Sequence, residues 1–230
     1  MSIEVAGLSK KFGEQVAVNN ISFTAKKGEL VGFLGPNGAG KSTLSNCISC
    51  ELLPTSGEAT VFGRSVSKDP SAVRSMAGMC RQDDYLYPNL SAREHLELYA
   101  GMRGVQSDDI PQMVQEWLES VDLQEVQEHY SSSFSGGMKR RLSLALATIG
   151  DRPLIILDEP TTGKCQTVGL PERKGRWLIL SIGMDPVNRR FVWRHIDAIK
   201  TDRVVLLTTH AMEEADLLAD NVAIMCQGDI

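Results

Sequence analysis

The sequence lacks a long hydrophobic run, an excess of positive charge and a regular cysteine pattern, and each absence excludes a class of protein. No apolar stretch approaches the ~18 residues of a membrane-spanning helix, the longest candidate being residues 177–184. The formal net charge is −5, whereas nucleic-acid-binding proteins usually carry a basic face, so we expect no nucleic-acid partner. Of the five scattered cysteines, only Cys47 and Cys50 have metal-like spacing. Because no second pair completes a site, we interpret both as buried thiols.

The composition that remains is that of an ordinary globular α/β domain. The chain has 230 residues, of which 42% are hydrophobic and 23% are charged, and this length suits one large domain or a domain with a subdomain. Short apolar segments separated by polar turns predict a small β layer near the N-terminus, followed by a further strand. The strands predicted in this part are Ser2–Val5, Val16–Ile21, Leu30–Leu34, Gly57–Gly63 and Ala77–Gln82.

The middle of the chain predicts helices, and two apolar runs after it predict buried strands. Residues 91–94, Ser-Ala-Arg-Glu, form a capping box, whose side chains satisfy free backbone donors at the start of a helix. Two further helices are predicted over Ile110–Val121 and Gly136–Ile149. The runs Pro153–Asp158 and Val204–His210 have the continuous apolar character of central parallel strands, which are buried on both faces.

The most informative motif is a glycine-rich loop between a predicted strand and a predicted helix. Eight consecutive residues match the pattern G-x-x-x-x-G-K-[ST]: Gly35, Pro36, Asn37, Gly38, Ala39, Gly40, Lys41 and Ser42. The backbone N–H groups of such a loop form a concave anion site, which the positive end of the following helix strengthens. Lys41 would reach the β- and γ-phosphates, and the Ser42 hydroxyl would ligate Mg²⁺. We therefore predict that this loop, with Thr43 after it, binds a nucleoside triphosphate.

Two further segments distinguish among the proteins that carry this loop. Residues 134–141, Phe-Ser-Gly-Gly-Met-Lys-Arg-Arg, resemble the signature sequence of ATP-binding cassette (ABC) ATPases, and residues 157–163, Leu-Asp-Glu-Pro-Thr-Thr-Gly, resemble their Walker B segment. The resemblance extends over essentially the whole chain. Phe134 and Met138 depart from the commonest signature, Leu-Ser-Gly-Gly-Gln. Together with residues 184–190, this variant is most similar to the A subfamily and to bacterial drug-export ATPases.

The resemblance implies a fold and a domain organisation. The implied fold class is α/β, a P-loop NTPase with a RecA-like core, an N-terminal antiparallel β layer and an inserted α-helical subdomain. We expect a single ABC ATPase domain over residues 1–230, with the helical subdomain over about residues 84–150. The family continues beyond the segment that ends this chain, so we expect Ile230 to be a fragment boundary.

The resemblance also implies catalytic and metal-binding roles at the ends of three strands. Asp158 would hold Mg²⁺, and the adjacent Glu159 would be the general base for the attacking water. Gln82 resembles the glutamine that contacts Mg²⁺ and water, and His210 resembles the switch histidine that contacts the γ-phosphate. The alternatives are a solvent-exposed acid for Glu159, an ordinary turn residue for Gln82 and a structural histidine for His210.

Two further contacts to the nucleotide are implied. Ser135, Gly136 and Gly137 begin a predicted helix, whose N-terminal end would receive the γ-phosphate of an ATP held by a second subunit. Helix capping alone is the alternative role of Ser135. Phe12 resembles the aromatic residue that stacks on adenine, although a core phenylalanine at a strand end has the same appearance.

The implied function is an ATP-binding and ATP-hydrolysing domain that powers transport through an ATP-sandwich dimer. Its cofactors would be ATP and Mg²⁺. Its partners would be a second nucleotide-binding domain, arranged head to tail, and the transmembrane domain of an ABC transporter. It would lie on the cytoplasmic face of a membrane, attached through a transmembrane domain outside this chain. The alternatives are a soluble ABC ATPase without a transport role and a hydrolysis-impaired ATP-binding fragment.

One segment interrupts the family pattern. The family continues directly from Thr-Thr-Gly to Met-Asp-Pro, whereas here residues 164–183 separate Gly163 from Met184. The residues at both junctions can be encoded by splice-site sequences, so we interpret the segment as translated intron, with a true surface insertion as the alternative. A sole transcript that retained the segment would exclude the intron. If the protein contains it, we expect ATP binding to persist and hydrolysis to be impaired, because the segment follows the catalytic carboxylate.

Overall fold

The structure is a computed structural model, and it describes residues 2–162, 169–171, 177–179 and 184–230. Its strands are β1 (Ser2–Phe12), β2 (Gln15–Lys26), β3 (Leu30–Leu34), β4 (Ser56–Val61), β5 (Arg64–Ser65), β6 (Ala77–Cys80), β7 (Leu154–Asp158), β8 (Gly169–Pro171), β9 (Trp177–Ile179), β10 (Val204–Thr209) and β11 (Asn221–Ile224). Its α-helices are α1 (Lys41–Ile48), α2 (Pro70–Met76), α3 (Ala92–Met102), α4 (Ile110–Ser120), α5 (Gly136–Thr148), α6 (Pro186–Ile199) and α7 (Met212–Leu218). Three short 3-10 helices are η1 (Gln124–Val126), η2 (Ser131–Ser133) and η3 (Lys200–Asp202).

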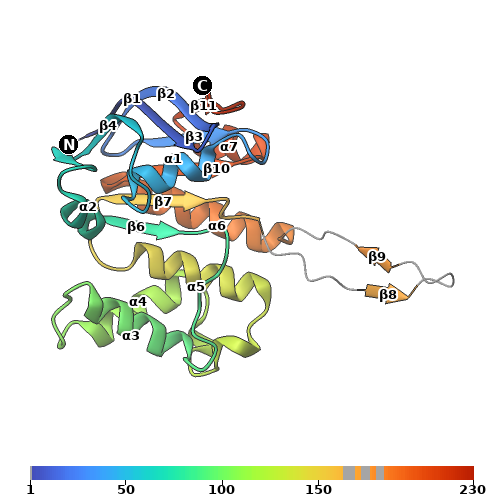
Figure 1. Cartoon of the computed structure of the whole chain (residues 1–230). Helices are drawn as coiled ribbons and strands as arrows, with labels where there is room; N and C mark the ends of the chain where they lie inside the picture. Colours follow the sequence, from blue (N-terminus) through green and yellow to red (C-terminus); the bar gives the residue numbers. More distant parts are fainter. Residues whose placement is uncertain (1, 163–168, 172–176, 180–183) are drawn as a thin grey trace.

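Two sheets form separate layers of the described structure (Figure 1). The first sheet is antiparallel, with the strand order β2-β1-β4-β5. The second is parallel, with the order β11-β3-β10-β7-β6. Because the strands of the second sheet run in one direction, the segments that follow β3, β6, β7 and β10 leave from the same edge. This edge therefore brings together four of the segments that the sequence singled out.

Apolar side chains from both sheets and from α1 form the central core. Leu44 and Ile48 of α1 are fully buried in the same cluster as Ile156 of β7. The neighbouring Ile155 points to the opposite face of the sheet, where it joins a second cluster that includes residues of α5 and α6. Since successive residues of β7 are buried on opposite faces, the strand needs apolar side chains at every position. The prediction of a buried central strand is confirmed.

The helices α3, α4 and α5 surround a third core cluster, which lies below the parallel sheet in Figure 1. The predicted capping box at the start of α3 is confirmed: Ser91 Oγ accepts a hydrogen bond from the Glu94 backbone N–H at 3.2 Å, and Glu94 Oε2 accepts one from the Ser91 N–H at 2.7 Å. At the other end of α3, Arg103 donates to the carbonyl oxygens of Leu146 and Ala147 at 2.7 and 3.1 Å. This partly buried arginine connects α3 to the last turn of α5.

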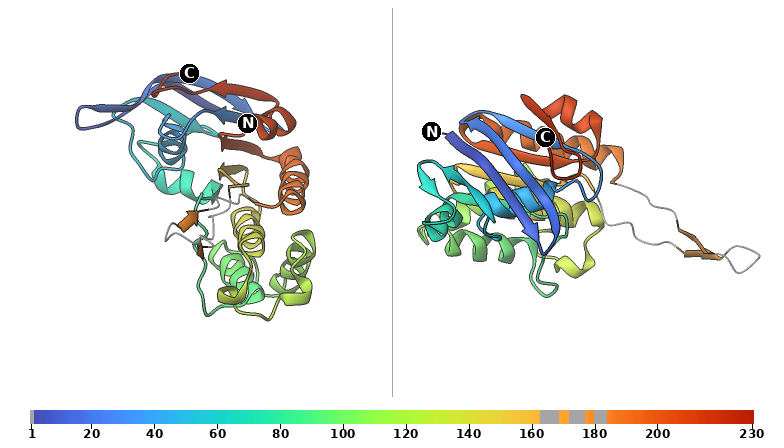
Figure 2. Two further views of the ribbon diagram at one scale, coloured as in Figure 1. Left: turned by 90° about the vertical axis from the view of Figure 1, so that its right-hand side faces the viewer. Right: turned by 45° about the horizontal axis from the view of Figure 1, so that its top comes forward.

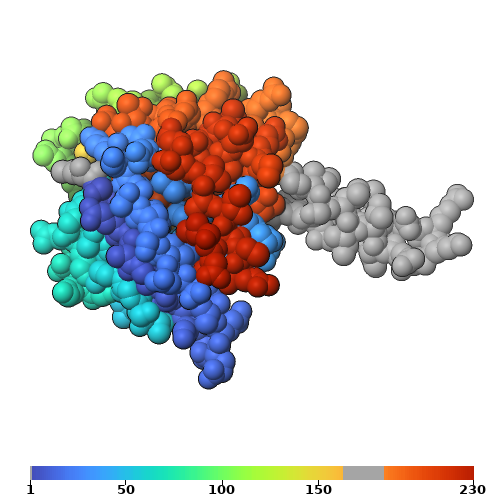
Figure 3. All heavy atoms as spheres, turned by 90° about the horizontal axis from the view of Figure 1, so that it is seen from above, coloured from blue at the N-terminus to red at the C-terminus, as the bar shows by residue number. Residues whose placement is uncertain are grey.

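The N-terminal strands and the C-terminal segment lie beside each other on the face shown in Figure 3. The Asn19 N–H donates to the Gly228 carbonyl at 2.8 Å, and the Gly228 N–H donates to the Ala39 carbonyl at 3.0 Å. The turn that contains Gly228 thus contacts both the antiparallel sheet and the glycine-rich loop, and it helps to fix the loop against the body of the protein.

Some boundaries differ from the sequence-based expectation. β1 was expected to end at Val5 but continues to Phe12, because register shifts between Val5 and Leu8 interrupt the alternation that identifies a strand. Gly7 lies inside this irregular stretch with a left-handed backbone, φ +59°. The strand over Leu30–Leu34 is confirmed, and the helix predicted over Gly136–Ile149 is confirmed to within one residue. The helices α6 and α7 were not predicted.

The segment 164–183 contains the described strands β8 and β9, which pair with each other in an antiparallel ladder. Gly169 is opposite Ile179, and Pro171 is opposite Trp177. These strands belong to neither of the two main sheets, and they lie away from the rest of the molecule in Figure 1 and in the right-hand view of Figure 2. The remainder of the segment lies outside the described residues. Among the helices that the structure describes, none is long and apolar enough to cross a membrane.

Candidate functional site

The glycine-rich loop connects the end of β3 to the first turn of α1. Gly40 occupies the N-cap of α1 with φ +102°, a backbone conformation that glycine adopts without strain. A Cβ at Gly40 would lie 2.1 Å from the carbonyl oxygen of Ala17, so no larger residue fits. Lys41 folds back over the loop, where its Nζ donates to the carbonyls of Gly35 at 2.7 Å and Pro36 at 3.1 Å. The lysine is buried, and its charge lies at the concave side of the loop.

Hard oxygen ligands meet beside the loop. Ser42 Oγ donates a hydrogen bond to Asp158 Oδ1 at 3.0 Å. Thr208, on the neighbouring strand β10, donates its hydroxyl hydrogen to the same carboxylate oxygen. Because β7 and β10 are parallel and place Asp158 opposite Thr208, the register of the sheet creates this contact. A serine hydroxyl and a carboxylate next to a phosphate-binding loop fit Mg²⁺, which prefers oxygen ligands together with phosphate and water.

Glu159 lies at the centre of a cluster of polar side chains beside the loop. Its side chain is only 6% exposed, and its backbone is left-handed, with φ +48°. One carboxylate oxygen lies 3.5 Å from Lys41 Nζ. The other lies 3.4 Å from His210 Nδ1 and accepts hydrogen bonds from Gln82 Nε2 at 3.3 Å and Thr162 Oγ1 at 3.2 Å. The structure therefore brings together Glu159, Gln82, His210 and Lys41, and it places Glu159 in the interior rather than in solvent.

A cavity of about 610 Å³ opens over this cluster and the loop. Its lining residues come from the antiparallel sheet, the loop, the end of β6, the end of β7 and the C-terminal turn: Phe12, Gln15, Val16, Ala17, Asn37, Gly38, Gly40, Lys41, Ser42, Thr43, Gln82, Glu159 and Gln227. Phe12 is half exposed at the rim, and Lys10 Nζ lies 5.2 Å from the centre of its ring. An exposed aromatic face beside the loop can stack on a planar base.

The signature residues are not in this cavity. Ser135 is the N-cap of α5, and its Oγ accepts a hydrogen bond from the Met138 N–H at 3.3 Å. Gly136 has open space around its Cα, whereas a Cβ at Gly137 would lie 2.6 Å from the side-chain amide of Asn188. The residues at the N-terminal end of α5 thus do not line the cavity over the phosphate loop of their own chain.

The segments that flank the site carry two carboxylates with displaced pKa values. Burial raises the pKa of Glu214 above its usual value, and the hydrogen bond from Trp193 opposes this rise. Trp193 Nε1 donates to Glu214 Oε1 at 3.0 Å. This hydrogen bond connects α7, which follows His210, with α6. The pKa of Asp185, the N-cap of α6, is below its usual value because it accepts hydrogen bonds, first from the Asn188 N–H.

Three residues of this neighbourhood escaped the sequence analysis. Thr208 lies in the apolar run of β10, where it looks like an ordinary strand residue. Thr162 and Gln227 reach the site from loops, and only the tertiary fold shows their proximity. A signal was present for Thr208, because a hydroxyl in a strand predicted to be buried needs a hydrogen-bond partner.

Comparison with known proteins identifies the family. The family model described as "ABC transporter" matches residues 18–162. ABC transporter A family member 2 of Arabidopsis thaliana is 40% identical over 244 residues, covering 99% of this chain and 23% of that protein. The phospholipid-transporting ATPase ABCA3 of Mus musculus is 35% identical over 232 residues, covering 99% of this chain and 12% of that protein. The chain spans less than a quarter of the length of these two relatives.

Solved structures show the same fold. The ATP-binding subunit of an ABC transporter has a TM-score of 0.82 and 25% identity, covering 100% of this chain and 88% of that one. The ATP-binding cassette MJ0796, solved as a dimer in a post-hydrolysis state with ADP and Pi, has a TM-score of 0.81 and 22% identity, covering 99% of this chain and 96% of that one. With the family match over residues 18–162, these similarities show that the chain belongs to the ABC transporter family, that it has the fold of ABC ATP-binding cassettes and that its relatives include A-family members.

Proposed function

We propose that this chain is the nucleotide-binding domain of an A-type ABC transporter, in which Mg-ATP binding and hydrolysis drive transport across a membrane. The observation that carries the proposal is the convergence of Lys41, Gln82 and His210 on the carboxylate of Glu159, beside the phosphate loop. The A-family relatives, one of them named as a phospholipid-transporting ATPase, support lipid export as the class of transport.

In the proposed site, the loop residues and Lys41 bind the phosphates. The γ-phosphate offers Lys41 a stronger partner than the carbonyls of Gly35 and Pro36 that it now contacts, because charge-assisted bonds to phosphate are the stronger type. Ser42 and Asp158 would hold Mg²⁺, which neutralises charge on the phosphate oxygens when it is bound.

Glu159 is the proposed general base. Its carboxylate is aimed by Gln82 and Thr162, which donate to the same oxygen, so the other oxygen remains directed toward Lys41 and the phosphate loop. A water between this carboxylate and the γ-phosphate would lose its proton to Glu159 as it attacks. His210 and Gln82 would orient the water and the phosphate. Catalysis of this type relies on positioning and on charge stabilisation rather than on covalent chemistry.

A second nucleotide-binding domain would complete the site. The N-terminal end of α5, with Ser135, Gly136 and Gly137, has helix N–H groups and a positive dipole end, and these residues do not line the cavity of their own chain. These groups are suited to the γ-phosphate of an ATP held by a partner arranged head to tail. The dimeric MJ0796 cassette, which has the same fold, supports this arrangement.

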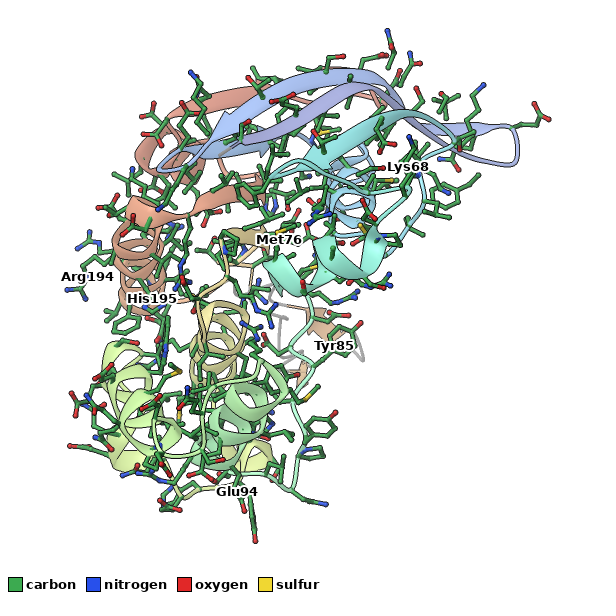
Figure 4. The ribbon with its side chains drawn as sticks, turned by 90° about the vertical axis from the view of Figure 1, so that its left-hand side faces the viewer. Lys68, Met76, Tyr85, Glu94, Arg194 and His195 are labelled. Atoms are coloured by element: carbon green, nitrogen blue, oxygen red, sulfur yellow. The ribbon has the colours of Figure 1, made fainter. Side chains whose placement is uncertain are left out.

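The transmembrane partner would be sensed through the segment after β6. Gln82, which contacts Glu159, is followed within five residues by the exposed aromatic side chains of Tyr85 and Tyr87. Tyr85 lies on the connection between the sheet and the helices α3–α5 (Figure 4). A transmembrane domain that packs on these rings would move the segment that carries Gln82. Attachment to such a domain would hold the chain at the cytoplasmic face of the membrane.

The segment 164–183 supports a second candidate, an ATP-binding domain whose hydrolysis is impaired. It begins two residues after Thr162, which bonds to Glu159, and its described strands β8 and β9 form a ladder separate from the main sheets. In the proposed dimer, this part of the chain would face the partner subunit. The added chain would therefore hinder formation of the sandwich and displace Asp185 from it, while the phosphate loop would still bind ATP.

Deletion of residues 164–183 is expected to raise ATP turnover without changing ATP affinity. We expect phosphate release to increase about tenfold or more, because misplacement by about 1 Å can cost 10²-fold in rate. Sedimentation velocity with Mg-ATP should show a dimer for the deleted chain carrying Glu159→Gln, and a monomer for the intact chain carrying the same substitution. Equal turnover with and without the segment would contradict the impairment, and a monomer with Mg-ATP for both chains would contradict the dimer assignment.

A further inference from the structure

Arg140 is among the largest completely buried side chains that the structure describes, with 1% of its side chain exposed. Its guanidinium carries five N–H donors in a planar fork. These donors face six acceptor atoms that come from two separate segments: the carbonyl oxygens of Arg81, Gln82, Asp158, Glu159 and Pro160, and Asp84 Oδ1. Burying a cation is costly unless all its donors are satisfied. The acceptors around Arg140 meet this requirement, and their positions indicate which parts of the structure the side chain holds.

The first set of acceptors is the turn that carries the proposed general base. Arg140 Nη2 donates to the Asp158 carbonyl at 3.1 Å and to the Glu159 carbonyl at 2.8 Å, and Nε donates to the Pro160 carbonyl at 2.6 Å. Glu159 has a left-handed backbone, which a residue with a side chain adopts only when its surroundings impose it. Three consecutive carbonyls held by one rigid fork impose that conformation.

The second set is the segment that carries Gln82. Arg140 Nη1 donates to the carbonyls of Arg81 and Gln82 and lies 3.2 Å from Asp84 Oδ1. The side chain of Asp84 is 23% exposed, and it is the ion-pair partner recorded for Arg140 among the described residues. One guanidinium therefore holds the backbone of both residues whose side chains meet at 3.3 Å, Gln82 and Glu159.

The position of Arg140 on α5 connects the two segments that it holds to the N-terminal end of this helix. It lies on α5, one helical turn after Gly136 and Gly137, which are the first two residues of the helix. A shift of the N-terminal end of α5 carries the guanidinium with it, because the two positions share one turn of a hydrogen-bonded helix. The end of α5 that would meet the partner's nucleotide is thus rigidly connected to the backbone of the catalytic groups in its own chain.

We propose that Arg140 is a positioning residue that couples the N-terminal end of α5 to the general base, by holding the backbone of Glu159 and Gln82 in the geometry that places their side chains together. The proposal rests on the proposed roles of Glu159 and Gln82. In this arrangement, the contact of α5 with a second subunit determines whether Glu159 is correctly placed. A lysine cannot replace Arg140, because an ammonium group offers three donors from one point and cannot span both segments.

The test is Arg140→Lys in the full chain, with Arg103→Lys as the matched control. Arg103 is a partly buried arginine whose guanidinium also donates to backbone carbonyls, but its acceptors lie at the C-terminal end of α5. We expect Arg140→Lys to lower kcat by about 100-fold, the size typical of a misplaced catalytic group, with unchanged KM and unchanged Mg-ATP affinity. Arg103→Lys should lower the melting temperature and leave kcat unchanged. Single-turnover phosphate release resolves slow rates.

Backbone hydrogen exchange provides a second readout that does not depend on turnover. In Arg140→Lys, peptides that cover residues 81–84 and 156–162 should exchange faster, and the same peptides of Arg103→Lys should match the unmodified chain. Unchanged exchange there, or equal losses of kcat in both lysine variants, would overturn the proposal. The Glu159→Gln variant separates the two ideas: if it retains full turnover, the assignment of the base fails, and the exchange measurement alone decides the role of Arg140.

Discussion

The Glu159→Gln variant is expected to bind Mg-ATP at least as well as the unmodified chain and to release phosphate about 10³-fold more slowly, the middle of the range for loss of a general base. Glutamine has the same shape, so the hydrogen bonds from Gln82 and Thr162 retain an acceptor oxygen. It cannot accept a proton from water. Binding is preserved, because removing a negative charge 3.5 Å from Lys41 favours the approach of phosphate.

Glu213→Gln is the control for this change. Glu213 lies on α7, near the site, with a side chain 69% exposed, and its distance of 3.8 Å from Arg189 makes a weak surface pair. The same chemical substitution at Glu213 should leave phosphate release unchanged. A Glu159→Gln variant that released phosphate within a few-fold of the unmodified chain would show that another group accepts the proton.

The second large effect is expected at the phosphate loop. Lys41→Ala should weaken Mg-ATP binding by about 100-fold, which corresponds to the loss of one or two charged hydrogen bonds to the phosphates. Lys41 is buried at the concave side of the loop. Water that fills the space left by its side chain supplies no positive charge to the phosphates. Affinity measured by the fluorescence of a nucleotide analogue should show the loss.

Lys27→Ala is the matched control, because Lys27 is an exposed lysine paired with Asp202 at 3.1 Å, and it precedes β3 whereas the loop follows that strand. Its affinity for Mg-ATP should equal that of the unmodified chain. Thermal unfolding of both variants distinguishes lost binding from lost folding. If Lys41→Ala bound Mg-ATP as tightly as Lys27→Ala, the loop would not be the phosphate site.

The elements that the sequence predicted best are those with one dominant physical signal. β7 was predicted because both of its faces are buried, which requires a continuous apolar run. The start of α3 was predicted because the capping box is a local hydrogen-bond pattern. β1 was predicted too short, because a bulged strand breaks the alternation. α7 was missed, because a helix of seven residues, Met212–Leu218, is too short to show a clear period.

The same distinction applies to the candidate site. The glycine-rich loop is contiguous in sequence and its geometry follows from its own residues, so Gly40 and Lys41 could be placed before the fold was known. The role of Arg140 could not be predicted, because a cationic residue on an amphipathic helix normally faces solvent. Its acceptors lie between 18 and 59 residues away in sequence, and only the packing of α5 against β6 and β7 brings them together.

The central claim is that the loop from Gly35 to Ser42 binds the phosphates of ATP, and that Glu159 then assists the attack of water on the γ-phosphate. Isothermal titration of the unmodified chain with Mg-ATP and with AMP tests it most directly, because AMP retains the base and sugar and lacks the β- and γ-phosphates. The account predicts saturable heat with Mg-ATP and binding of AMP that is weaker by about 100-fold or more, as expected when charged hydrogen bonds to the distal phosphates are lost. Absence of heat with Mg-ATP for a folded sample, or equal affinity for AMP, would contradict it.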